Sequence, residues 1–347
     1  MISLLIPTLN RSSFIIRYLN YLNNNNFEGA VYIGDSSNQE HFDKTRCAIA
    51  RIKPKFEMAH IAYPGLLDFE CILKMLPSIK TPYAMYMCDD DFLVCKSVKK
   101  AIAFLENNPI YSGVTGKGIF FNIRGDGAFG PIGDVIEDPL RGYEQDKPRE
   151  RLSALFNIDY RPVNALSRTD QFVKRWIDRK DFRLKELATE VLPWCLMVVH
   201  GKVKKLDELF MVRQQHGQRY LLPDVFDTLA TPEWLPSSLI FQDEVAKVLN
   251  KYDDMDLDEA IKFVRGLFKR YWIDLICYKF GNSKKREKRA KLKEKLKKIK
   301  VLRQLVQKGR IIKSVLRNEP SLTTLSRPSS PYYEDFSAIV TACKNEI

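Results

Sequence analysis

The chain has 347 residues, of which 45% are hydrophobic and 29% charged, a composition typical of a globular protein with one large or two ordinary domains. Lys and Arg number 56 against 43 Asp and Glu, and the formal net charge of +13 favours an acidic partner such as nucleic acid, anionic lipid or a phosphorylated substrate. No apolar run approaches the ~20 residues of a membrane-spanning helix, and the N-terminus lacks the basic start of a secretory signal.

The first 106 residues alternate short apolar runs with helical patterns. We predict strands over 3–6, 30–34, 57–62 and 83–87, and helices after Asn10, over 67–76 and over 97–106. Asn10 is expected to cap the first helix, whose apolar positions are 14, 15, 18, 19 and 22. This alternation predicts an α/β fold built on a largely parallel sheet.

Polar side chains follow three of these predicted strands where the strands end, in the segments 7–11, 35–37 and 89–91. Ligands of open parallel sheets bind beyond the carboxyl ends of the strands. We therefore expect the three segments to converge on one edge of the sheet and to form a ligand site there.

Three consecutive aspartates, Asp89, Asp90 and Asp91, directly follow an apolar strand. Adjacent carboxylates repel one another, and a divalent cation or a hydrogen-bonding ligand offsets that repulsion. Mg²⁺ and Mn²⁺ take one or two carboxylates and complete their shell with water and diphosphate oxygens. In an extended chain Asp89 and Asp91 project to the same side, so this pair is a candidate for ribose and metal contacts. The alternative is an acidic turn that caps the helix that follows.

The later segments carry weaker patterns. Residues 125–148 are rich in Gly, Pro and Asp, which predicts an irregular loop or an active-site flap. Residues 238–280 have a helical pattern, and the chain after Glu319 is expected to be an extended arm. The seven cysteines form no CxxC pair and predict reduced thiols in a cytoplasmic protein. We expect Cys88 to pack beneath the sheet and find no constellation around His41, His60 or His200.

Most of the positive charge lies in one segment. Residues 284–317 hold 16 Lys and Arg and two Glu, a net charge of +14, so that the rest of the chain carries −1. Apolar residues recur there at steps of three and four, which predicts a basic amphipathic helix suited to an anionic membrane surface. The alternatives are a solvated helix or packing arm and a nucleic-acid contact. The last is disfavoured because 284–300 holds no aromatic residue for base stacking.

Three segments of the first half carry a family resemblance: ISLLIPTLNR at the N-terminus, IGDSS after the second strand, and TPYAMYMCDDDF with its D-x-D. Together they resemble the nucleotide-binding half of GT-A glycosyltransferases of the family 2 type. The segments FLENNPIYSGVTGKG, NALSRT and GKVKKLDELFMVRQQH are similar to a bacterial subgroup linked to lipopolysaccharide and capsule assembly. The resemblance covers about residues 1–220. It implies nucleotide contacts from Pro7, Thr8, Asn10, Asp35, Lys74, Asp89, Asp90 and Arg213, and metal contacts from Asp91, Asp89 and His216.

Individual roles follow from the same resemblance. Asp35 would hydrogen-bond the base, and Lys74 would contact the diphosphate unless it is an ordinary solvated helix residue. Arg213 and His216 occupy the place of a diphosphate or metal contact, although a lone His is more often structural. Arg168 is a candidate for a phosphate or an acidic donor sugar.

An inverting enzyme also needs a general base that deprotonates the acceptor hydroxyl. Glu186 and Glu190 are the candidates, one helical turn apart and just before an apolar stretch that would raise a carboxylate pKa. Glu186 is preferred, and a surface acid without a catalytic role is the alternative. The family more commonly has a Glu-Asp pair here, which leaves the base and the stereochemistry open.

The leading hypothesis is a nucleotide-sugar glycosyltransferase that uses Mg²⁺ or Mn²⁺ and, by default, a UDP-sugar. It would act on a lipid-linked or lipopolysaccharide-type acceptor at the inner face of the cytoplasmic membrane, with a homo-oligomer left open. The alternatives are a nucleotidyltransferase or related nucleotide-sugar enzyme, and a non-enzymatic protein that binds nucleic acid through the basic helix. The expected division is a GT-A domain over 1–225, a helical extension over 226–282, a membrane-surface helix over 283–318 and an arm over 319–347.

Overall fold

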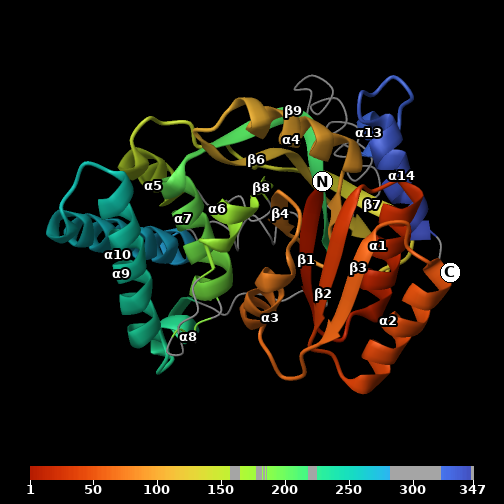
Figure 1. Cartoon of the computed structure of the whole chain (residues 1–347), viewed down its shortest axis with the longest axis horizontal. Helices are drawn as coiled ribbons and strands as arrows, with labels where there is room; N and C mark the ends of the chain where they lie inside the picture. The colour runs from red at the N-terminus through yellow and green to blue at the C-terminus, as the bar shows by residue number, and fades with distance from the viewer. Residues whose placement is uncertain are drawn as a thin grey trace.

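The structure is a computed structural model that describes residues 1–156, 165–176, 182, 184, 186–217, 225–281 and 322–344 (Figure 1). Two sheets form its centre. The first has the order β3-β2-β1-β4-β8, in which only β8 is antiparallel to its neighbour. Its strands are β1 (Ile2–Thr8), β2 (Gly29–Asp35), β3 (Glu57–Ala62), β4 (Tyr83–Tyr86) and β8 (Ser167–Arg168).

The second sheet has the order β5-β9-β6-β7, and within it β9 and β6 run parallel while the outer pairs are antiparallel. A short segment that holds the three aspartates joins the two sheets, since β4 of the first sheet ends at Tyr86 and β5 of the second begins at Phe92. The strands are β5 (Phe92–Leu93), β6 (Tyr111–Ile123), β7 (Ile132–Asp138) and β9 (Lys202–Gln215).

Helices cover both faces of the first sheet and form a separate layer beyond it (Figure 1). Near the two sheets lie α1 (Ser12–Asn24), α2 (Gln39–Ile52), α3 (Asp68–Met75), η1 (Leu76–Ser78), α4 (Cys95–Asn107), α6 (Thr169–Val173), α13 (Leu322–Leu325) and α14 (Tyr333–Lys344). The helical layer holds α5 (Pro148–Phe156), the π-helix η2 (Glu186–Val191), α7 (Leu192–His200), α8 (Val225–Ala230), α9 (Trp234–Tyr252) and α10 (Leu257–Gly281).

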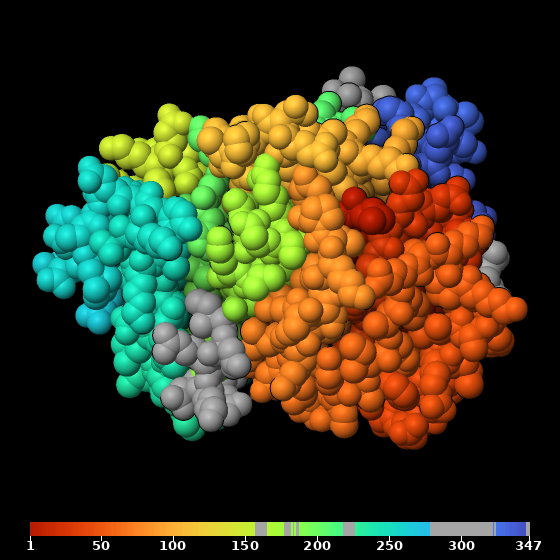
Figure 2. Space-filling view, viewed as in Figure 1, coloured from red at the N-terminus to blue at the C-terminus, as the bar shows by residue number. Residues whose placement is uncertain are grey.

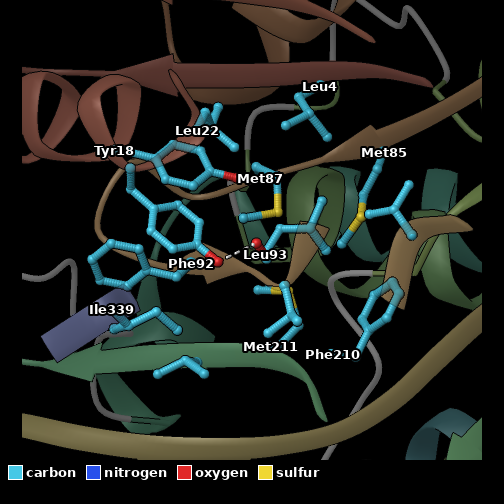
Figure 3. Packing of buried hydrophobic residues seen from close by; sticks show 14 of the residues in the cluster. Leu4, Tyr18, Leu22, Met85, Met87, Phe92, Leu93, Phe210, Met211 and Ile339 are labelled. Atoms are coloured by element: carbon cyan, nitrogen blue, oxygen red, sulfur yellow. Dashed lines mark hydrogen bonds between the residues drawn. The ribbon is translucent and has the colours of Figure 1, made fainter. Parts of the chain in front are cut away.

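Alternation of side chains along β1 explains the layering. Ile2, Leu4 and Ile6 enter a core shared with α1 and the second sheet, whereas Leu5 enters a smaller core with α3. In Figure 3 the larger core brings together β1, α1, the chain around β5, and β9, with Ile339 of α14 at its margin. A third core joins α5, α7, α9 and α10. The expected α/β class, with a Rossmann-like parallel sheet and a helical region after it, is confirmed.

Two expectations for the loops and tail were wrong. Residues 132–138 of the predicted irregular loop form β7, because Phe121 and its neighbours in β6 offer a strand edge that β7 pairs with. The described part of the predicted extended arm contains two helices, α13 and α14, and Phe336, Ile339 and Cys343 of α14 are buried against the main core. These apolar residues, spaced three and four apart, give the tail a face that can be buried.

Other expectations concern the surroundings of these elements. All seven cysteines are free, as predicted, but Cys88 lines the cavity described below instead of packing beneath the sheet. Arg168 donates hydrogen bonds to the carbonyls of Tyr111, Leu105 and Asn108, so it holds the end of α4, and its role as a phosphate or sugar contact stays a prediction. The basic segment 284–317 lies outside the described residues. No helix in the described ranges is long and apolar enough to span a membrane.

Candidate functional site

The three polar segments converge at the carboxyl edge of the first sheet, as the sequence predicts. β1 lies between β2 and β4, so the chain after β1 and the chain after β4 leave the sheet in different directions and open a crevice. A cavity of about 450 Å³ lies there. Pro7, Thr8 and the three aspartates line one side of it. The Thr8 hydroxyl donates to Asp89 Oδ2 at 2.6 Å and ties the two segments together.

Asp89 faces the loop after β1. Arg11 Nη1 lies 2.9 Å from Asp89 Oδ1 and 3.4 Å from Asp90 Oδ2. Both aspartates are almost fully buried, and the Arg11 side chain is 18% exposed, so the guanidinium closes one wall of the cavity while it compensates two carboxylates.

Asp90 is held from the opposite direction by the chain after β9. His216 Nε2 lies 2.8 Å from Asp90 Oδ2, and the imidazole stacks on Phe14 of α1 with ring centroids 4.6 Å apart. The other ring nitrogen, Nδ1, is buried and meets no hydrogen-bond partner among the described residues. His216 is thus placed at the aspartates as expected, and in this arrangement its Nε2 serves Asp90.

Asp91 is bound by β9 itself. Its Oδ2 accepts from Arg213 Nε at 3.1 Å, and its Oδ1 accepts from the backbone N–H of Gln214 at the same distance. Arg213 Nη1 lies 3.4 Å from Asp138 Oδ2, a carboxylate with no solvent exposure at the end of β7. One guanidinium therefore lies between two acidic groups and lines the cavity with its half-buried side chain.

The three aspartates have different pKa values because burial, neighbouring charges and hydrogen bonds act on them differently. Burial and the neighbouring Asp90 charge raise the pKa of Asp91 to about 7 and that of Asp89 to about 6, against the opposing effects of Arg213 and Arg11. Burial also acts on Asp90, but hydrogen bonding to His216 and the charges around it bring its pKa below the ordinary value. Added positive charge beside Asp89 and Asp91 would favour their ionised forms.

A divalent cation fits this donor set. Ligand atoms of Cys88, Asp90 and Asp91 lie within 4.8 Å of one another, the only such cluster among the described residues. Burial and the adjacent aspartates raise the pKa of the Cys88 thiol well above its ordinary value, so a protonated sulfur is a poor partner for Mg²⁺ or Mn²⁺. The two carboxylates are the suitable ligands. Asp89, expected as a metal ligand, instead faces Thr8 and Arg11, and its metal role stays a prediction.

A buried arginine lies directly beneath the aspartates. Arg17 of α1 is 1% exposed, and its Nη2 donates to the Asp90 carbonyl at 2.8 Å. Its Nη1 donates to the Ala128 carbonyl at 2.6 Å and to Gln214 Oε1 at 2.5 Å. The guanidinium carbon lies 4.6 Å from the ring centre of Phe92. Arg17 therefore holds the aspartate turn and the end of β9 in one arrangement.

The far side of the cavity carries acidic and aromatic groups. Glu190 of η2 and Asp68 at the start of α3 both line it, as does Tyr86. Thr189 donates to Asp68 Oδ1 at 3.0 Å, which connects η2 to α3. Glu190 is thus brought to the site. Glu186 begins the same π-helix, but its side chain lies outside the described residues.

Three expected nucleotide contacts do not line the cavity. Asp35 is 1% exposed, and its carboxylate accepts from Ser37 N–H and lies 2.8 Å from His60 Nε2, so His60 does have a partner. Asn10 lies at the surface with φ 54° and accepts from the Asn38 N–H, while Arg11 takes the N-cap position expected of Asn10. Lys74 is exposed on α3. Their nucleotide roles stay predictions.

Four residues that build the site had no individual role in the sequence prediction: Arg11, which was expected there only as part of the segment 7–11, and Arg17, Gln214 and Asp138. Arg17 did leave a signal, because it lies three residues after Phe14 and so at the border of the apolar face predicted for the first helix. A charge there indicates a buried partner. Asp138 left none, since its role depends on β7 pairing with β6.

No family model matches the chain, and no curated protein matches it in sequence. Among solved structures, it is similar to S. aureus TarS, with TM-score 0.48 and 12% identity over 78% of this chain and 43% of that one. The chain thus spans less than half the length of that TarS chain. TarS 1–349 gives TM-score 0.48 at 12% identity, covering 81% and 73%. Its complex with UDP-GlcNAc gives 0.43 at 13% identity, covering 78% and 72%. These values describe a partial likeness of backbone and assign no chemistry to this chain.

Proposed function

We propose that this protein is a nucleotide-sugar-dependent glycosyltransferase of the GT-A type. One observation carries the proposal: a cavity at the switch point of a parallel sheet brings three buried aspartates together with Arg11 and Arg213. A nucleoside diphosphate sugar has the matching chemistry, with ribose hydroxyls that bind carboxylates and a diphosphate that binds guanidinium groups.

The two arginines are the diphosphate ligands in this proposal. Arg11 comes from the loop after β1 and Arg213 from β9, so they approach the crevice from different elements. Both guanidinium groups form ion pairs with carboxylates, so their positive charges are held in position before the substrate binds. A fixed cation beside the leaving diphosphate stabilises the negative charge that develops as the glycosidic bond breaks.

Asp90 and Asp91 are the metal ligands that we propose. A bound Mg²⁺ or Mn²⁺ would neutralise the diphosphate as it leaves. The protein supplies two carboxylate oxygens and, through the Gln214 N–H and Arg213, keeps Asp91 in one orientation. Asp89, bonded to Thr8, is left to accept a ribose hydroxyl at the nucleotide side of the cavity.

Glu190 is the general base that we propose. It lines the same cavity as the three aspartates, and a carboxylate there can accept the proton of an acceptor hydroxyl that attacks opposite the leaving diphosphate. Its carboxylate takes the proton of the acceptor hydroxyl. The acceptor oxygen then bonds to the anomeric carbon as the bond to the diphosphate breaks on the opposite side, so the configuration at that carbon is inverted. Its position in a π-helix, a conformation frequent at functional sites, supports the same role.

We propose a lipid-linked or surface-polysaccharide acceptor at the cytoplasmic face of a membrane. The basic segment 284–317, with a net charge of +14, supports this location. An enzyme held at the surface that carries its acceptor gains effective concentration.

The proposal is tested by calorimetric titration of UDP and other nucleoside diphosphates with and without Mn²⁺, and by release of diphosphate from a panel of nucleotide sugars. Asp91→Asn should abolish the metal-dependent part of binding. Asp254→Asn, the same substitution at an exposed aspartate that does not line the cavity, is the matched control and should bind like wild type. Absence of nucleotide binding in the wild type, or unchanged metal dependence in Asp91→Asn, would contradict the proposal.

Glu190→Gln separates the base from the binding residues. It should lower turnover by about 10²–10⁴-fold while nucleotide affinity stays within about twofold of wild type. Turnover at the wild-type rate would remove Glu190 from the mechanism and leave Glu186 as the candidate.

A further inference from the structure

Helix α10 presents a cationic face to solvent. Lys262, Arg265, Lys269 and Arg270 are all exposed, and we call these four residues the cationic stripe. Their spacing of three, four and one residues places them on one side of the helix. Ile273 follows on the same side and is 50% exposed. From Lys262 to Ile273 the stripe runs for about 16 Å at 1.5 Å per residue.

The opposite face of α10 fixes the direction of the stripe. Ala260, Val264, Leu267 and Phe268 are buried in the helical core with α9. The Phe268 and Phe241 ring centroids are 4.7 Å apart. Because these contacts hold the helix by its apolar side, the stripe does not turn inward, and its charges act together on one surface.

No ion pair joins the stripe to an acid among the described residues. The segment from 260 to 273 holds no Asp or Glu, while the exposed acids Asp258 and Glu259 precede the stripe and Asp274 follows it. Two surface lysines of α4 do form ion pairs. Lys99 lies 2.8 Å from Glu28, and Lys100 pairs with Glu208 of β9. Four exposed cations that form no ion pair among the described residues, followed by an exposed isoleucine, suit an acidic partner with an apolar layer behind its charge.

We propose that the cationic stripe of α10 is a docking surface for an anionic lipid membrane. The charges match acidic headgroups, and Ile273 matches the acyl boundary beneath them. α10 ends at Gly281, three residues before the basic segment 284–317 begins, so the cationic stripe and the basic segment are close together in the sequence. Nucleic acid fits less well, because no exposed side chain is aromatic in 257–277, the part of α10 whose side chains the structure describes. Membrane docking by α10 does not depend on glycosyl transfer.

The first experiment measures partition of the full-length protein onto vesicles. The fourfold variant Lys262→Gln, Arg265→Gln, Lys269→Gln, Arg270→Gln keeps 284–317 intact. Each Lys or Arg at an anionic surface contributes about fivefold in partition, so loss of two contacting residues predicts a decrease of about 25-fold. Vesicles of phosphatidylcholine with 30–40% phosphatidylglycerol, at 0.1 M salt, are compared with phosphatidylcholine alone.

The matched control removes the same charge from the other end of the molecule. Lys44, Arg46, Arg51 and Lys55 lie exposed on and after α2, far from α10 in the space-filling view (Figure 2). Their replacement by Gln lowers net charge equally. We expect partition within about twofold of wild type, which separates docking by one surface from attraction by overall charge.

The second experiment uses two exposed thiols. Cys277 lies on α10 beyond Ile273, and Cys47 lies on α2. A polarity-sensitive fluorophore on Cys277, in a Cys47→Ser background, should shift to the blue when anionic vesicles are added. The same fluorophore on Cys47, in a Cys277→Ser background, should not shift.

Two results would overturn the proposal: equal loss of partition in the stripe variant and the α2 control, or an unshifted Cys277 fluorophore on vesicles that do bind the protein. Binding of single-stranded RNA that falls in the stripe variant while vesicle binding stays unchanged would also overturn it and assign the surface to nucleic acid. None of these measurements uses a nucleotide sugar, so failure here is distinguishable from failure of the proposed transferase activity.

Discussion

Replacement of Arg17 tests whether the aspartate turn depends on a buried support. Arg17 donates to three oxygens, those of Asp90, Ala128 and Gln214, and is 1% exposed. A hydrogen bond from a charged donor contributes about 1.5–3 kcal/mol, while burial of the cation itself opposes folding and lowers the pKa of Arg17. We therefore expect Arg17→Met to cost about 4 kcal/mol. Arg17→Lys, which retains the charge but cannot span all three oxygens, should cost about 2 kcal/mol.

Two measurements together distinguish a positioning role from a purely structural one. Urea unfolding gives the loss of stability, and calorimetric titration of UDP with Mn²⁺ gives the effect on the cavity. A positioning residue behind metal ligands typically costs 10–100-fold in affinity when replaced, so Arg17→Lys should weaken binding by at least about 10-fold while the protein stays folded.

Arg151 supplies the control for this experiment. It is 4% exposed and also donates to backbone carbonyls, including that of Val198 at 2.6 Å, but it holds the end of α7 and does not line the cavity. Arg151→Lys should destabilise the fold to a similar extent and leave nucleotide affinity unchanged. The reasoning is refuted if Arg17→Met unfolds like wild type, or if Arg151→Lys weakens binding as much as Arg17→Lys.

Two further predictions concern stability. Burial raises the pKa of Asp138 from 3.8 to about 6, and a carboxyl with a raised folded pKa loses stability as pH rises through that range. Relative to Asp138→Asn, wild type should lose up to about 3 kcal/mol of unfolding free energy between pH 4 and pH 7; parallel pH profiles would contradict this. In α14, Ile339 is fully buried, so Ile339→Ala should cost about 2–4 kcal/mol by thermal unfolding, whereas the exposed Thr341→Ala should be near neutral. Equal melting temperatures would mean that α14 does not pack as described.

Local pattern was sufficient for most N-terminal elements, but α2 (Gln39–Ile52) was not predicted, because only Thr45 and Ala48 of this helix are buried and its apolar pattern is weak. The strand expected over 57–62 is β3 without change of bounds, and the expected helix over 67–76 is α3 within one residue at each end. Buried strands and amphipathic helices carry their signal in their own residues, so a short window is enough to find them. β7 and α14 were missed because each is defined by what it packs on: β7 pairs with β6, and α14 covers the core beside α1.

The candidate site divides in the same way. The sequence was enough to predict that polar residues follow the ends of parallel strands and lie at one edge of the sheet. Thr8 and Asp89 do contact each other at that edge. Which donor pairs with which aspartate depends on the tertiary structure. Arg11 precedes the aspartates by about 80 residues, whereas Arg213 and His216 lie together at the end of β9, more than 120 residues after them, and each carboxylate pairs with the donor that the fold brings within reach. Hydrogen bonds act over about 3 Å, whereas sequence order carries no distance between segments that, as here, are 78 to 126 residues apart.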